Sequence, residues 1–270
     1  MGVDDAPHGA GSEQRAAGRS FGPLPAARCP LPAKGRVDAS LFFVEPYTKS
    51  ELRFHITGAV LNGMVLTAGL MWFFTHLPVW PWIVVAILAG IYSADLISGT
   101  LHWAFDTWFH ENISFLRRMV LQVREHHVYP NRIFLIHFLH DAGTLSWIAL
   151  IITTPIIALA IALKVGAVIL GCAVFSILLV TMLAFHKIGH RARQPRWIRV
   201  LQKCRLLISA KHHSQHHGGN HDYNYCLING WTDDTLGRAG FFRALEWVIA
   251  RTTGAVPRQN DHEWLRRFGQ

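Results

Sequence analysis

The stretch "LSWIALIITTPIIALAIALKVGAVILGCAVFSILLVTMLAF", residues 145–185, decides the fold. A helix needs about 20 mostly apolar residues to cross the hydrocarbon core of a bilayer, and this stretch is roughly twice that length. Its one charged residue is Lys164, and a glycine follows two positions later. We therefore predict a helical hairpin with spans at 145–163 and 165–185 that turns at residues 164–166.

Two earlier stretches, residues 54–75 and 81–101, are also long and apolar enough to span a bilayer. The second contains Asp95, which must be paired or lie near the interface because a carboxylate in hydrocarbon is costly. Together the stretches predict an all-α membrane protein with about four transmembrane helices. The alternative, four buried helices of a soluble domain, fails because a chain of 270 residues is too short to cover them.

The composition agrees with lipid-embedded segments. Hydrophobic residues make up 51% of the chain and charged residues only 16%, against about 25% charged in soluble domains. The four cysteines form no C-x-x-C pair, which argues against a zinc ribbon or a disulfide framework and favours a reduced, cytosol-facing setting. Residues 1–48 have no apolar core of signal-peptide length and are predicted to be a mobile N-terminal tail.

The basic residues behind the net charge of +9 lie on one side of the predicted spans. They follow the second span and the fourth, whereas the connection between the first two spans has none and the hairpin turn has only Lys164. The positive-inside rule places both basic segments and both termini in the cytoplasm. The charge is therefore interpreted as membrane-flanking and not as a nucleic-acid footprint.

Most of the 17 histidines gather in groups on this same predicted side. Residues four apart on a helix share a face, so several of these groups can aim two side chains at one point. The groups are His102 with Asp106, His126 with His127, His137 with His140, His186 with His190, and His212, His213, His216 and His217 in "KHHSQHH". We predict a shared metal centre in a histidine-rich helical cap.

The residue types restrict the metal without fixing it. Histidines in excess with a carboxylate and no thiolate pair leave iron, zinc, copper and manganese open, and the ligands are too many for one tetrahedral zinc. Two irons beside a bilayer would suit oxygen-dependent C–H chemistry on an alkyl or acyl chain. A metal transporter would instead need polar residues along the spans, which have almost none, and a non-catalytic scaffold would not require all of these groups.

Several motifs, in this order along the chain, resemble the Kua/CarF-type membrane lipid desaturase family. They are "GTLHWAFDTW" (99–108), "REHH" (124–127), "HKIGH" (186–190), "LISAKHHSQHH" (207–217), "YNYCLINGW" (223–231) and "FFRALEWVIARTTGAVPR" (241–258). The family includes plasmanylethanolamine desaturase, which forms the vinyl ether bond of plasmalogens, and a plant plastid enzyme that desaturates a fatty acyl chain. The resemblance runs from about Asp95 to Pro257.

The resemblance implies an oxidoreductase that uses a non-haem di-iron centre, molecular oxygen and an external electron donor, a ferredoxin or a b-type cytochrome. It gives a desaturase domain at 49–257 and a C-terminal tail at 258–270. The favoured substrate is a plasmanylethanolamine-type ether lipid. An acyl-lipid desaturase or hydroxylase is the alternative, and a membrane metal-binding or transport protein comes after it.

Carried over to this sequence, the family's ligand positions are His102, Asp106, His126, His127, His186, His190, His212, His213, His216 and His217. One segment departs from the pattern, since alignment on Phe138 puts Ile136 where plasmanyl-type members have a histidine. Whether His137 or His140 replaces it stays open, and His140 is the expected ligand. Residues expected to support the ligands are His137, Asp141, His221 and Asn224.

Overall fold

The computed structural model describes residues 47–114, 116–191, 193–218, 221–258 and 261. Residues 1–46, 259–260 and 262–270 of the two predicted tails lie outside the described residues. The described part is all-α, as predicted, and contains no strand. Its long helices are α1 (Lys49–Thr75), α2 (Trp80–Thr107), α4 (Phe138–Ala162) and α5 (Gly166–Val180).

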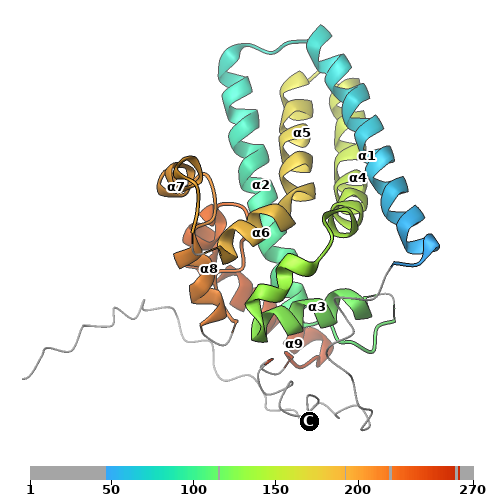
Figure 1. Ribbon diagram of the computed structural model, residues 1–270. Helices are drawn as coiled ribbons and strands as arrows, with labels where there is room; N and C mark the ends of the chain where they lie inside the picture. The colour runs from blue at the N-terminus through green and yellow to red at the C-terminus, as the bar shows by residue number, and fades with distance from the viewer. Residues whose placement is uncertain (1–46, 115, 192, 219–220, 259–260, 262–270) are drawn as a thin grey trace, which may run out of the picture.

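The long helices form a bundle in the lateral order α2, α5, α4, α1 (Figure 1). Close backbone approach holds the neighbours together, as expected where helices pack in lipid. A Cβ on Gly143 of α4 would lie 2.3 Å from the His55 Cβ of α1, and one on Gly90 of α2 would lie 2.6 Å from the Gly171 carbonyl oxygen of α5. At these two contacts between neighbouring helices only glycine fits.

The predicted hairpin is present, with α4 ending at Ala162 and α5 beginning at Gly166. The second arm is not one straight span, however. A bend of 49° separates α5 from α6 (Met182–His190). Because α5 has 15 residues, it is about 22 Å long, and a hydrocarbon core of about 30 Å needs part of α6 as well. The described residues thus hold three helices long and apolar enough to cross a membrane, or four if α5 and α6 count as one.

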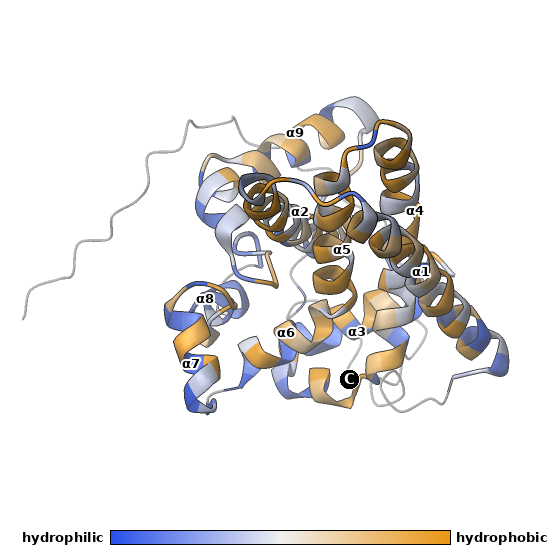
Figure 2. Cartoon of the chain, turned by 90° about the horizontal axis from the view of Figure 1, so that it is seen from above, coloured by the Kyte–Doolittle hydropathy of each residue, from blue (hydrophilic) through white to orange (hydrophobic). Residues whose placement is uncertain are grey.

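Apolar side chains face outward around the bundle. Met71, Phe74 and Ile151 expose 68%, 68% and 71% of their surface, and hydrophobic residues dominate α2, α4 and α5 when the molecule is seen from above (Figure 2). A soluble monomer rarely exposes so large an apolar surface. The exposure fits helices surrounded by lipid.

A cap of shorter helices covers the end of the bundle at which α2 and α6 end (Figure 1). It contains α3 (Arg117–Val128), α7 (Arg196–Lys203), α8 (Ala210–His217) and α9 (Phe241–Thr253). A 3₁₀ segment (Pro130–Leu135) follows α3, and a π-helical turn (Asp233–Gly237) precedes α9.

Asp95 joins the cap to the bundle. Its Oδ1 accepts the backbone N–H of Asn229 and of Gly230 at 3.0 and 3.1 Å, and its Oδ2 accepts that of Thr232 at 2.9 Å. The prediction that this carboxylate must be paired is confirmed. Its partners are backbone donors of the loop before the π-helical turn, so an acidic residue on α2 fixes the shape of that loop.

Candidate metal centre

The cap brings metal-ligating side chains together in two adjoining groups. The aspartate group consists of His102, Asp106, His127 and His216, and the five-histidine group consists of His126, His186, His190, His213 and His217. Within each group the candidate ligand atoms lie within 4.8 Å of one another. The sequence had predicted every one of these residues as a metal ligand.

Four helices supply the two groups. The last turns of α2 carry His102 and Asp106, and α6 carries His186 and His190, each pair four residues apart. Both α3 and α8 contribute to both groups, so the groups adjoin. The ring centroids of His126 and His127 lie 4.7 Å apart, although the two imidazoles belong to different groups.

In the aspartate group, three imidazoles surround one carboxylate. The Nε2 atoms of His102 and His216 lie 3.5 and 3.4 Å from Asp106 Oδ2, and His127 Nε2 lies 3.5 Å from Oδ1. Both oxygens of Asp106 are buried and have no hydrogen-bond partner among the described residues. Such a carboxylate is costly unless a cation or a donor compensates it, and three nitrogen ligands beside it suit a metal ion.

A hydrogen bond on Nδ1 orients each imidazole of the aspartate group. His102 Nδ1 donates to the Tyr225 carbonyl at 2.9 Å, and His216 Nδ1 donates to the Tyr223 carbonyl at 2.8 Å. His127 Nδ1 donates to Asp261 Oδ2 at 2.6 Å. Since a carbonyl or carboxylate oxygen only accepts, each Nδ1 carries the proton and each Nε2 presents its lone pair to the group. The three imidazoles are thus already in the tautomer that binds metal.

The five-histidine group places nitrogen atoms against nitrogen atoms. His213 Nε2 is 2.9 Å from His190 Nε2 and 3.1 Å from His217 Nε2. The Nε2 atoms of His126 and His186 are buried without a hydrogen-bond partner within the described ranges. A neutral imidazole has only one N–H, so five cannot satisfy one another, whereas a metal ion would accept all five lone pairs.

Burial keeps the cap imidazoles uncharged. Loss of solvation lowers the pKa of His126, His127, His213 and His216 well below 6.5, and neighbouring imidazoles lower it further. Burial first, and then the charges of nearby histidines, lower the pKa of His217 to about 2. Neutral imidazole is the form that ligates metal, so these residues are ready to bind at neutral pH.

The structure places His212, which the doubled histidine motif predicts as a ligand, outside both groups. Its Nε2 lies 2.9 Å from Asp233 Oδ2. The same carboxylate accepts the backbone N–H of Tyr225 at 3.1 Å and of Cys226 at 2.9 Å. His212 lies at one edge of the face that α8 turns to the metal groups, and its side chain tethers the following loop.

His140 and His137 also lie outside both groups. The His140 ring is buried, stacked on Tyr47 with centroids 4.7 Å apart and meeting His55 edge-on at 4.6 Å. His137 is the N-cap of α4 and accepts the backbone N–H of Leu139 at 3.3 Å. In this structure neither lies with the candidate ligands of the two groups. The side chain of Asp141 lies outside the described residues.

Two other expected supporting residues differ in their placement. His221 is buried, and its ring stacks on His127 with centroids 4.0 Å apart and planes 4° apart. It therefore packs directly behind a candidate ligand. Asn224 is in the left-handed region at φ 57° and donates to Gln215 Oε1 at 3.1 Å. Asn224 shapes the loop after α8 and does not reach the metal groups.

Asp261 is a residue of the site that the sequence did not reveal. It lies in the segment predicted to be a C-terminal tail, yet it is buried and holds His127. Its Oδ1 accepts Arg124 Nε at 2.9 Å, and its Oδ2 is 3.4 Å from an Arg258 Nη atom. Candidate ligand atoms of His127, His221 and Asp261 also lie close together. The two guanidinium groups already balance this carboxylate, and its hydrogen bond to Nδ1 orients His127.

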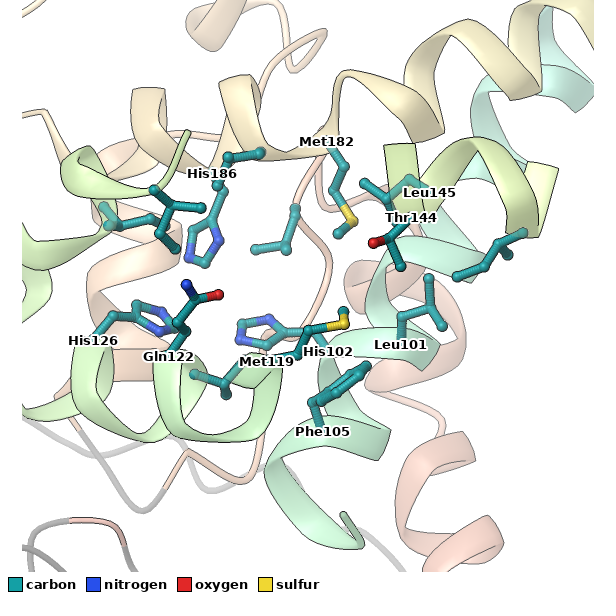
Figure 3. Close-up of a pocket in the computed structure, with 16 residues that line it drawn as sticks. Leu101, His102, Phe105, Met119, Gln122, His126, Thr144, Leu145, Met182 and His186 are labelled. Atoms are coloured by element: carbon teal, nitrogen blue, oxygen red, sulfur yellow. The ribbon is translucent and has the colours of Figure 1, made fainter. Parts of the chain in front are cut away.

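An apolar cavity of about 100 Å³ leads to the two groups. His102, His126 and His186 line one end, and Leu101, Leu145 and Met182 line the other (Figure 3). The polar side chains among the other lining residues are Gln122 and Thr144. The cavity therefore places mostly apolar side chains next to these imidazoles, as a hydrocarbon chain would require.

The cap thus places two candidate metal-binding groups at the end of an apolar helical bundle and beside an apolar cavity, which suits an enzyme that acts on lipid chains. Residues 91–260 match the lipid desaturase domain family, and the chain belongs to this family. It is thus a membrane lipid desaturase.

Three relatives show how far the similarity extends. Mouse plasmanylethanolamine desaturase 1 is 28% identical over 199 residues, which cover 70% of this chain and 72% of the mouse protein. Plasmanylethanolamine desaturase of Myxococcus xanthus is 31% identical over 65% of this chain and 63% of its own length. Fatty acid desaturase 4, chloroplastic, of Arabidopsis thaliana is 28% identical over 66% of this chain and 55% of its own length. No solved structure is significantly similar to the chain.

Proposed function

We propose that this chain is a di-iron enzyme that uses oxygen to introduce the vinyl ether double bond of plasmalogens into plasmanylethanolamine-type lipids. The observation that carries the proposal is the pair of ligand groups at the inner end of an apolar cavity. The relatives named plasmanylethanolamine desaturase support this choice of substrate.

The ligand set fits two ions. The aspartate group would hold one and the five-histidine group the other, since both contain buried ligand atoms that no protein donor satisfies. His212 and His140 are left out of this set. When bound, the irons supply the oxygen chemistry needed to remove hydrogen from an unactivated carbon, which no side chain can do.

The chain's own residues set which carbons react. His102 lies one turn before α2 ends at Thr107, so the centre sits at the end of the span and not at mid-bundle. A lipid whose headgroup lies at the interface presents its first chain carbons at that depth. The apolar lining from Leu101 to Met182 takes the carbons that follow and excludes water. This geometry favours a double bond close to the headgroup.

Acyl-lipid desaturation, or hydroxylation on the same centre, is the second candidate. It is favoured by Ile136, which stands where plasmanyl-type members have a histidine and lines the cavity with an apolar side chain. The similarity to the chloroplastic fatty acid desaturase points the same way. An acyl chain that reacts near its carboxyl end would also have its reacting carbons at this depth in the membrane.

We place the cap and both termini on the cytoplasmic side because the basic residues flank that end of the spans. A cytosolic electron donor, a ferredoxin or a b-type cytochrome, would then reach the centre from the cap. Protease accessibility of the cap in sealed vesicles of known orientation tests this placement. Cleavage only from the lumenal or external side would contradict it.

The test of function is lipid analysis of a host that makes plasmanylethanolamine but no plasmalogens. Expression of the chain should produce acid-labile vinyl ethers, and His216→Ala should abolish them while the protein still inserts. His76→Ala, at the far end of the bundle, is the matched control and should retain activity. New acyl double bonds without vinyl ethers would overturn the ether-lipid substrate and support the second candidate. Iron near two atoms per purified chain would support the metal assignment, and zinc alone would contradict it.

A further inference from the structure

The short helix α7 connects α6 to α8, two helices that supply candidate ligands. Figure 1 shows the spanning helices lengthwise and α7 nearly end-on, so α7 lies across the axis of the bundle. Along that axis it lies closer to the spanning helices than α8 does (Figure 1). A helix in this position runs parallel to the plane of a membrane that the bundle crosses.

One face of α7 exposes apolar side chains with no partner to cover them. Trp197 and Val200 are 64% and 57% exposed, whereas Ile198 on the inward face is only 3% exposed. Cys204, four residues after Val200, continues the outward stripe and is also exposed. Trp is enriched where proteins meet the interface of a bilayer, and this stripe begins with one.

A basic stripe runs beside the apolar one. Arg196, Arg199 and Lys203 recur at the same helical spacing, and all three are exposed. They form no ion pair with any described residue, and residues 191–211 contain no acidic side chain. An apolar stripe flanked by cations is typical of a helix that lies in the headgroup region of an anionic leaflet.

We propose that α7 is an interfacial helix that binds the anionic leaflet on the cap side of the membrane. Trp197 and Val200 enter the boundary between headgroups and acyl chains, and the basic stripe contacts lipid phosphates. The contact holds the connection between α6 and α8 at a fixed depth. This inference depends on neither the metal nor the reaction, so it stands or falls separately from the proposed function.

Cys204 provides the test. A nitroxide is attached to it in the full chain carrying Cys29→Ser, since Cys172 and Cys226 are buried. The protein is placed in nanodiscs of phosphatidylcholine, with or without phosphatidylglycerol. Collisions of the label with oxygen, which concentrates in lipid, are compared with collisions with a water-soluble nickel chelate. A label at Ser214→Cys, exposed on α8, in a chain that also carries Cys204→Ser, is the control for a cap position outside the stripe.

We expect the oxygen-to-nickel ratio at Cys204 to exceed that at the control position and to rise when phosphatidylglycerol is added. Replacing Arg196, Arg199 and Lys203 together by glutamine should remove the rise. A ratio at Cys204 equal to the control in both lipids would overturn the proposal. Shielding of Cys204 that develops only after a soluble acidic protein is added would overturn it too, because α7 would then be a protein-docking surface.

Discussion

Asp261→Asn tests how the aspartate group is held in its metal-binding form. Asp261 Oδ2 accepts His127 Nδ1–H at 2.6 Å, which leaves Nε2 unprotonated and facing Asp106. Asparagine keeps the size of the side chain but loses its charge. Its NH2 group, which only donates, must face the N–H donor of either His127 or Arg124, so one of the two hydrogen bonds is lost. Loss of a partner behind a metal ligand costs about 10–100-fold in metal affinity. That corresponds to about 1.4–2.7 kcal/mol, the range of a hydrogen bond to a charged group.

The assay is a metal titration of the metal-free full chain, with bound metal counted per chain. We expect one of two binding steps to weaken by about 10–100-fold and the other to stay unchanged, because no residue of the five-histidine group contacts Asp261 in the described structure. Asp222→Asn is the control, since Asp222 is half exposed and lies 3.9 Å from Arg243. Arg124 and Arg258 surround Asp261, so the thermal stability of the metal-free variant is measured in parallel. Two unchanged binding steps in a folded variant would refute the role of Asp261 in orienting His127.

The remaining predictions concern the ligand set, the cavity and pH. His213→Ala should lower the amount of metal bound per chain. His212→Ala should leave the bound metal unchanged and lower only thermal stability; a loss of metal in His212→Ala would show that His212 is a ligand. Met182→Trp should fill the cavity and reduce desaturation in vesicles, with metal content intact; full activity would place the lipid chain elsewhere. The metal-free protein should lose stability as the pH falls from about 7.5 to 5.5. Burial lowers the pKa of the imidazoles of α3 and α8 in the folded state, so over this interval the same histidines bind protons only in the unfolded chain. Each would contribute about 1.4 kcal/mol over that interval, and a melting temperature constant across it would contradict the burial.

The spans were predictable because lipid imposes a length and a composition that the sequence shows directly. Even the hairpin turn follows from Lys164, the one charge in the apolar run. The bend between α5 and α6 was not predicted, because residues on both sides of Thr181 are apolar. At the bend the Thr181 hydroxyl donates to the carbonyls of Ile177 and Leu178 at 2.7 and 3.2 Å, a local contact that often bends helices but that a lone threonine in an apolar run does not reveal.

The site was predictable where a helix fixes the spacing and not where the chain must return from a distance. Four-residue spacing identified His102 with Asp106 and His186 with His190. The motif at residues 212–217 predicted that α8 carries candidate ligands. The rotation of α8 depends on the Ser209 cap and on the contact between His212 and Asp233, so the outlying position of His212 could not be predicted. Asp261 has no spacing relation to His127, which lies 134 residues earlier.

The two groups differ in how they would compensate a bound cation. In the aspartate group, Asp106 supplies negative charge, and each imidazole has a fixed Nδ1 partner. In the five-histidine group, all ligands are neutral, and the Nδ1 atoms of His213 and His217 are buried without a hydrogen-bond partner in the described part of the chain. A divalent ion in this group would keep its full positive charge. Burying such a charge costs more free energy than burying a charge that a carboxylate partly neutralises. The aspartate group should therefore bind its ion more tightly, and the five-histidine group should hold the more exchangeable one.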